Sequence, residues 1–196
     1  MNPAIDVDLR GYYHGEEIAA YVIGGTGAAA AGAGAYLATR PEDFSRSLGW
    51  TWIGFGGLEA IGAVFYALQV DGEIAHYESV LARDPSAYRT EEMDHIAGTS
   101  RRFVVYRAVE IGLTLAGAGM AGYGLAAKQD VWTGTGVGIG SLALPLAVID
   151  TFNNARASRY LDRVRAFEPS VGIGFGGGAP NQHHERGWQL TLGARF

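Results

Sequence analysis

One carboxylate lies deep inside an otherwise uncharged part of the sequence. Glu59 is the only charged residue in the apolar and glycine-rich stretch 52–70. A carboxylate inside a bilayer costs a few kcal/mol unless it is protonated or paired, so such a residue is a candidate for proton or cation handling. The competing interpretation is a protonated glutamic acid that donates a hydrogen bond to a backbone carbonyl exposed by glycine packing.

Three other charged residues lie near the ends of apolar stretches. A rise of 1.5 Å per residue puts Arg107 and Glu110 within the first two turns of one span, and Asp150 at the end of the next. Arg107 can therefore pair with Asp150, or with Glu110 three residues later. We predict a structural ion pair here rather than a functional site.

Two glycine-rich runs, 24–34 and 134–140, could be mistaken for phosphate-binding loops. Neither follows a strand, and neither carries the Lys-Ser/Thr or the downstream acid that phosphate or dinucleotide binding requires. Small residues three or four positions apart instead favour close helix packing in membranes, within a subunit or between subunits. The residues predicted to pack in this way are Gly24, Gly27, Gly32, Gly117, Gly119, Gly136, Gly138 and Gly140.

Catalytic and metal-binding patterns are not recognisable in the sequence. His183, His184 and Glu185 could ligate a metal, but a solvated loop is the better interpretation because no neighbouring residue would orient the rings. The chain has no cysteine, which excludes disulfides and thiolate sites. No nucleophile–base pair emerges, so we expect a protein that is not an enzyme and has no cofactor or metal. A net charge of −5 argues against nucleic acid as a partner.

Four elements must position these residues. Charged residues largely avoid the windows 17–37, 52–70, 103–127 and 131–149, each close to the roughly 20 residues that span a bilayer. Glycine costs about 1 kcal/mol relative to alanine inside a soluble helix, whereas membrane helices use small residues for close approach. We therefore predict a mainly α, four-helix transmembrane bundle, with a soluble helical bundle as an alternative. The expected partners are the lipid bilayer and either copies of this chain or a larger membrane complex.

The second and fourth helices are predicted to run beyond the membrane. Apolar residues keep helical spacing in 71–83 and 153–167, and each stretch ends before a proline, Pro85 or Pro169. The third helix is expected to begin near Thr90, with Thr90 or Ser86 as its cap.

Residues 16–85 and 90–168 are predicted to be two repeated helical hairpins. Trp52 resembles Trp132 at the start of a second helix, and Tyr77 resembles Tyr160 near its end. Such repeats would be related by an axis along the membrane normal.

The two ends of the chain show the period-2 alternation of strands. A strand is predicted over 1–13 and a β-hairpin over 170–196, in a single membrane domain spanning 1–196. The last nine residues, 188–196, resemble the final strand of an outer-membrane β-barrel, which alternates apolar residues and ends in Phe. One hairpin cannot close a barrel, because open sheet edges do not survive in lipid. A small interfacial sheet is therefore preferred. Weakly hydrophobic helices suit a protein that must cross an inner membrane without stopping, so an outer-membrane location is the alternative.

The basic residues predict an orientation. Eleven of the fifteen Lys and Arg lie in the N-terminus, in 71–102 or in the C-terminal part, whereas the hairpin loops hold Arg40, Arg46 and Lys128. In an inner membrane, the default location, both termini would face the cytoplasm. Our leading hypothesis is a non-enzymatic membrane subunit that self-associates or binds a partner through its Gly/Ala-rich helices. The alternative is a channel or a proton-coupled transporter that uses Glu59.

Overall fold

The chain folds into four long helices. The computed structural model describes residues 3–169, which form α1 (Pro3–Ala38), α2 (Asp43–Arg83), α3 (Pro85–Ala127) and α4 (Asp130–Ala166). With 36 to 43 residues each, the helices are about 54–65 Å long at a rise of 1.5 Å per residue. All four are long and apolar enough to cross a membrane. The prediction of a mainly α, four-helix bundle is confirmed.

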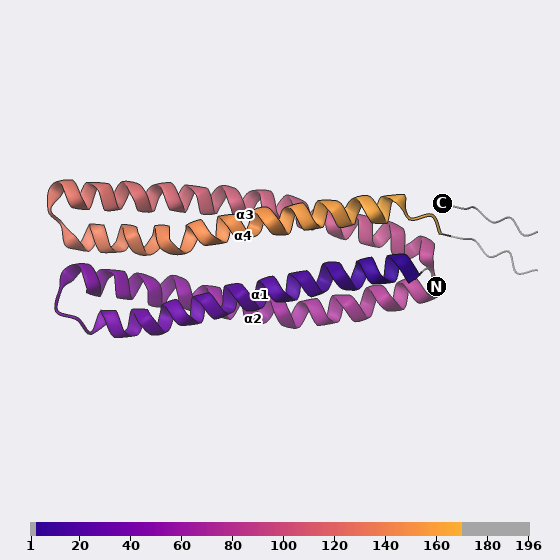
Figure 1. The fold of residues 1–196 in the computed structure, drawn as a ribbon, viewed down its shortest axis with the longest axis horizontal. Helices are drawn as coiled ribbons and strands as arrows, with labels where there is room; N and C mark the ends of the chain where they lie inside the picture. The colour runs from indigo at the N-terminus through magenta and orange to yellow at the C-terminus, as the bar shows by residue number, and fades with distance from the viewer. Residues whose placement is uncertain (1–2, 170–196) are drawn as a thin grey trace, which may run out of the picture.

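The helices form two antiparallel hairpins that lie side by side (Figure 1). α1 packs along α2, and α3 packs along α4; between the hairpins, α2 packs on α4. Within residues 3–169, the backbones of α1 and α3 do not pack along each other, and the two helices meet through side chains at the terminal end, where the Tyr13 hydroxyl donates to Glu92. We call the end that holds residues 39–42 and 128–129 the loop end, and the opposite end, where α2 connects to α3, the terminal end.

Asp84 alone connects the two hairpins. Its backbone is extended, and its carboxylate accepts hydrogen bonds from the backbone N–H groups of Ser86, at 2.9 Å, and Ala87, at 3.0 Å. Pro85 occupies the first position of α3, where a missing N–H costs nothing. The predicted ends of the second and fourth helices before the prolines are confirmed, whereas the third helix begins at Pro85 and not near Thr90. Asp84 is a better cap because its side chain reaches two free N–H groups.

The N-terminal residues are helical, so the strand predicted over 1–13 is wrong. The alternation of Ile5, Val7 and Leu9 indicated one buried face, but Val7 is 68% exposed whereas Ile5 and Leu9 are buried. Burial continues at Tyr12, which follows the spacing of a helix face. The described residues contain no strand, and the predicted β-hairpin over 170–196 lies outside them.

Large apolar side chains form the core at the terminal end only. A single cluster joins all four helices there and includes Leu9, Tyr13, Val70, Tyr77, Leu81, Tyr88, Ile96, Phe103, Tyr160 and Val164. Toward the loop end, the buried positions are mostly glycine and alanine, such as Ala63 and Ala143. Small side chains therefore hold this half of the bundle together.

The loop-end half exposes large apolar side chains. Leu58, Phe65 and Leu115 are 71%, 70% and 68% exposed. A soluble bundle buries such residues, whereas a membrane bundle turns them toward lipid and places small residues between its helices.

Glycine contacts join the two helices of each hairpin. A Cβ atom at Gly27 of α1 would lie 2.6 Å from the carbonyl oxygen of Gly56 in α2, and one at Gly117 of α3 would lie 2.7 Å from the carbonyl oxygen of Gly136 in α4. No side chain fits at either crossing without moving the backbone. The two hairpins thus pack through equivalent contacts.

Candidate functional site

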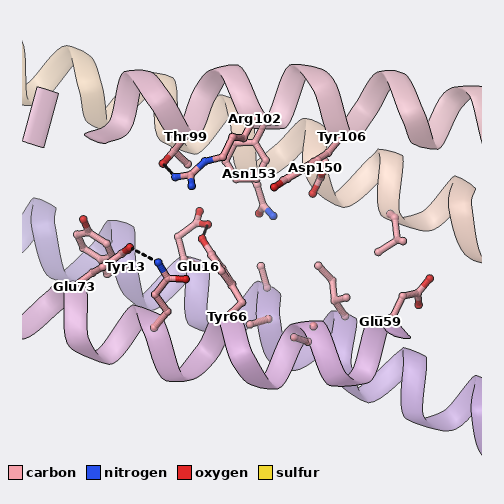
Figure 2. A pocket seen from close by; sticks show the side chains of 18 of the residues that line it. Tyr13, Glu16, Glu59, Tyr66, Glu73, Thr99, Arg102, Tyr106, Asp150 and Asn153 are labelled. Atoms are coloured by element: carbon pink, nitrogen blue, oxygen red, sulfur yellow. Dashed lines mark hydrogen bonds between the residues drawn. The ribbon is translucent and has the colours of Figure 1, made fainter. Parts of the chain in front are cut away.

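A chamber of about 690 Å³ lies where the four helices separate between these two packed regions. Its lining runs from Glu59 on the loop-end side to Glu73 and His95 on the terminal-end side. Figure 2 shows Glu59, Tyr66 and Glu73 on one side and Thr99, Arg102 and Tyr106 on the facing helix. The chamber lies at the interface between the two hairpins, because α1 and α2 line one part of it and α3 and α4 the other.

The lining contains more acids than bases. Every helix contributes at least one carboxyl group, and the five are Glu16, Glu59, Glu73, Glu110 and Asp150. The basic residues of the lining are Arg102 and His95. An uncompensated charge in such a place costs several kcal/mol, so each carboxyl group must be paired, protonated or neutralised by a ligand.

Glu16 is paired within the protein. Its side chain is almost fully buried, and one carboxylate oxygen lies 2.8 Å from Nη2 of Arg156 in α4. The Tyr66 hydroxyl donates to the other oxygen at 2.6 Å. Arg156 also donates to the side chain of Asn153 at 2.9 Å. This network connects α1, α2 and α4 and is structural.

Glu110 and Asp150 lie against each other with no base between them. Asp150 is 7% exposed, and its carboxyl group lies close enough to that of Glu110 for the two charges to interact. Two carboxylates this close, with no base in contact, repel each other unless one of them holds a proton or a cation lies beside them. One oxygen of Glu110, Oε2, is buried and receives no hydrogen bond from the described residues.

The ion pair that the sequence predicts at this point is not formed within 4 Å in the described part of the chain. Arg107 does interact electrostatically with Asp150, but across a longer distance. The structure brings Glu110 and Asp150 together and leaves Arg107 outside the chamber lining.

Glu59 lines the loop-end side of the chamber. It is partly buried, and within residues 3–169 it forms no hydrogen bond or ion pair. A Cβ atom added at Gly27 would lie 2.8 Å from the Cβ atom of Glu59, so the two residues are in close contact. Glu59 is close enough to Glu110 for the two charges to interact. The sequence identified both residues but did not show that they share one chamber.

A cluster of tyrosines around Glu92 closes the terminal-end side. Glu92 is completely buried, and its carboxylate accepts hydrogen bonds from the hydroxyls of Tyr160, at 2.8 Å, and Tyr13, at 3.1 Å. Tyr88 and Tyr160 share a further hydrogen bond of 2.8 Å. Burial raises the pKa of Glu92 to about 7, although the tyrosine hydrogen bonds and the charge of His95 act in the opposite direction.

His95 links this cluster to the chamber. Its Nε2 atom lies 3.6 Å from a carboxylate oxygen of Glu73, and its ring centre lies 5.4 Å from that of Tyr77. The contact with Glu73 raises the pKa of His95 above its ordinary value. A titratable base therefore lies between the buried tyrosine cluster and the acids of the chamber.

Most of the glycines predicted to pack against helices do so within this chain. Gly24 and Gly140 also lie on the inner sides of their hairpins, and a Cβ at Gly138 would lie 2.8 Å from the side chain of Thr51 in α2. A Cβ atom added at Gly32 or at Gly119 would meet no atom within 4 Å, so these two glycines face outward.

The lining of the chamber is rich in carboxyl groups. No group of three or more His, Asp or Glu side chains among residues 3–169 could hold a metal ion. The carboxyl groups of Glu59, Glu110 and Asp150 can each bind a proton or face a cation. Comparison of the chain with protein-family models, with curated protein sequences and with solved structures gives no match.

Proposed function

We propose that the chain is an integral membrane protein whose loop-end half crosses the bilayer. The support is the inverted packing of that half, in which residues such as Phe65 and Leu115 are exposed and small residues are buried. The terminal-end half packs like a soluble protein around its aromatic cluster. With spans at 17–37, 52–70, 103–127 and 131–149, the helices would extend about 20–27 Å beyond the bilayer at the terminal end.

In this arrangement both hairpin loops lie on one side of the membrane and the terminal end on the other. Trp52 and Trp132 lie near the loop-side boundary, where aromatic residues are favoured. The basic residues of the terminal end assign that side to the cytoplasm if the membrane is an inner one.

The two hairpins are proposed to be repeats of one ancestral unit. Gly27 and Gly117, the contact residues of the first helices, are 90 positions apart, and their partners Gly56 and Gly136 are 80 apart. The difference of ten arises because Gly27 and Gly56 are 29 positions apart in the first hairpin, whereas Gly117 and Gly136 are 19 apart in the second. In transporters built from repeats, ligand sites lie at the repeat interface, which is where this chamber lies.

The function that this geometry supports best is proton-coupled transport of a cation, without enzymatic chemistry. The observation that carries it is the pair of half-buried Glu110 and buried Asp150, which line a chamber between the hairpins with no base in contact. A cation that enters would take the place of a proton held by one of these two acids. The net charge of the chamber would then be the same with the proton bound as with the cation bound.

Glu59 and His95 have distinct roles in this proposal. Glu59, nearest the loop end, is the deepest carboxyl group to bind the cation or its proton. His95, with Glu73, passes protons between the chamber and the terminal end. Toward the loop end the chamber is closed by the packing of α2 on α4, where Trp52 Nε1 donates to Ser141 Oγ at 3.0 Å. Transport requires these two helices to separate.

Reconstitution tests the proposal. The full chain would be placed in liposomes that contain a pH-sensitive dye, and gradients of Na⁺, K⁺, guanidinium or tetraphenylphosphonium would be applied in turn. At least one cation should drive a pH change. Glu59→Gln should abolish it without altering the assembly state, whereas Asp162→Asn, at an exposed side chain outside the chamber, should not. Absence of any cation-driven pH change with the unaltered chain contradicts the proposal.

A second candidate function is self-association within the membrane. It is favoured by Gly32 and Gly119, whose outward faces are free of contacts within the described chain. Replacing each with leucine should convert an oligomer to a monomer in detergent without unfolding it. A chain that is already monomeric excludes this candidate.

A further inference from the structure

The chamber does not match the requirements of a bare inorganic cation. Ions such as Ca²⁺ and Mg²⁺ need several oxygen ligands converging at about 2–2.6 Å, and residues 3–169 contain no group of three or more His, Asp or Glu side chains that could hold a metal ion. A volume of about 690 Å³ lies instead in the range of about 300–1,000 Å³ typical of sites for organic ligands. Much of the lining is apolar and includes Ala19, Ala20, Ile23, Leu58, Phe103 and Leu146.

The chamber reaches the surface between α2 and α3. Leu58, Tyr66 and Tyr106 line it and are also 71%, 36% and 52% exposed. In Figure 2, Tyr66 and Tyr106 project from facing helices across this opening. All three lie within the proposed spans, so the opening faces the bilayer. A ligand dissolved in the membrane could enter here without crossing the aqueous phase.

The groups inside the opening recognise positive charge on an apolar body. The rings of Tyr66, Tyr106 and Phe103 provide faces for cation–π contact. Behind them, Asp150 is more than nine-tenths buried with no base in contact, and Oε2 of Glu110 receives no hydrogen bond from residues 3–169. Arg102 lines the terminal-end side of the chamber, away from Glu59 (Figure 2).

We propose that the ligand is a monovalent organic cation with a bulky apolar body, which enters laterally from the bilayer between α2 and α3. Its positive charge lies against Glu110 and Asp150, and its apolar part lies against Leu58, Phe103 and Leu146. This inference rests on the proposed function and specifies its substrate class. The three lining carboxyl groups without a basic partner within 4 Å among the described residues, Glu59, Glu110 and Asp150, disfavour an anionic lipid, and a neutral lipid would leave them uncompensated.

Equilibrium dialysis of the full chain in a neutral detergent provides the test. The probe is tetraphenylphosphonium, and the matched control is tetraphenylborate, which has nearly the same shape and the opposite charge. The chain should bind the phosphonium saturably and the borate not at all. Tetramethylammonium, which lacks the apolar body, should not displace the phosphonium at equal concentration.

Variants locate the site. Glu110→Gln and Asp150→Asn should each weaken phosphonium binding about tenfold or more, whereas Asp162→Asn should leave it unchanged. Helix content and elution volume, measured in parallel, identify a variant that fails to fold. The comparison of phosphonium with borate on the unaltered chain needs no variant and stays decisive.

The outcomes separate this inference from the function on which it rests. Equal binding of both ions, or no phosphonium binding, overturns the organic-cation inference. If small cations still drive pH changes in liposomes in that case, proton-coupled transport survives with a different substrate. If no cation drives a pH change, both proposals fall.

Discussion

The buried carboxyl groups of this protein are neutralised in different ways. Glu16 has an arginine partner, Arg156, and a tyrosine donor. Glu92 has tyrosine hydroxyls but no base within ion-pair distance among the described residues. Glu110 and Asp150 have mainly each other. The first arrangement is an ion pair, whereas the other two have no base in contact among the described residues.

Because Glu92 is buried without a base, we predict that the free energy of unfolding falls as pH rises. The fold raises its pKa from 4.5 to about 7, so the folded state binds more protons than the unfolded state between these values. The pKa of His95 is also raised, and its stabilising charge is likewise lost as pH rises. Glu92 alone should account for roughly 3 kcal/mol between pH 4.5 and pH 8.

Thermal unfolding in detergent at pH 5 and pH 8 measures this effect. The unaltered chain should have the higher Tm at pH 5. Glu92→Gln, which keeps a carbonyl acceptor for the tyrosines, should reduce the difference and raise the Tm at pH 8. A Tm that rises with pH, or the same pH dependence in both proteins, contradicts this account of Glu92.

Sequence reasoning found part of the candidate site. Glu59, Glu110 and Asp150 stand out because they lie in or next to apolar windows. Glu16 and Glu92 lie in charged segments, where an acid is normally a solvated surface residue. One signal was present: Glu92 lies between Tyr88 and Ile96 at steps of four residues, so it interrupts an apolar helical face. The sequence cannot show which helix faces that stripe.

At the scale of the helices, glycines decide where the backbone can approach a neighbour. Gly117 meets the backbone of α4, whereas a Cβ atom at Gly122 in the same helix would meet no atom within 4 Å. The sequence pattern shows small residues at both positions. Only the rotation of α3 about its axis, which depends on all its partners, distinguishes them.

Gly117→Ala should therefore destabilise the protein by about 1–3 kcal/mol, because the new methyl group pushes the helices apart. Gly122→Ala is the matched control and should be neutral or stabilising by up to about 1 kcal/mol. Gly27→Ala and Gly25→Ala should repeat this contrast in the first hairpin. Denaturant titration in mixed micelles measures all four. Equal effects at Gly117 and Gly122 would show that the close α3–α4 contact is not formed.

The helices themselves follow largely from the sequence. Prolines and apolar spacing place the ends of α2 and α4 correctly, because both act within a few residues. The N-terminal segment was assigned wrongly because five alternating residues also fit a helix that buries Ile5 and Leu9. The start of α3 was missed because Asp84 caps it from a one-residue connection, for which periodicity gives no signal.

At the scale of the whole molecule, the protein combines a loop-end half held by small residues, which we propose to lie in the membrane, with a terminal-end half packed around aromatic residues. This division explains why the mean hydropathy of the chain does not indicate its class: the loop-end half exposes large apolar side chains, whereas the terminal-end half buries them. It also places the chamber at the boundary between them.

Labelling of single cysteines tests this division. The chain has no native cysteine, so each introduced thiol reports alone. In sealed vesicles of one orientation, Lys128→Cys at the loop end and Asp162→Cys at the terminal end should react with a membrane-impermeant maleimide from opposite sides. Leu115→Cys, in the lipid-facing surface, should not react from either side. Reaction of Lys128→Cys and Asp162→Cys from the same side contradicts the proposed topology.

The central claim is that the chamber exchanges protons for a cation, and proton release on binding tests it most directly. Tetraphenylphosphonium would be mixed with the full chain in weakly buffered detergent at pH 6.5 while a dissolved indicator follows the pH. The account predicts saturable release of about one proton per bound cation, lost in the Glu110→Gln/Asp150→Asn double variant and retained in Asp162→Asn. Binding without proton release, or the same release from the double variant, would contradict the account.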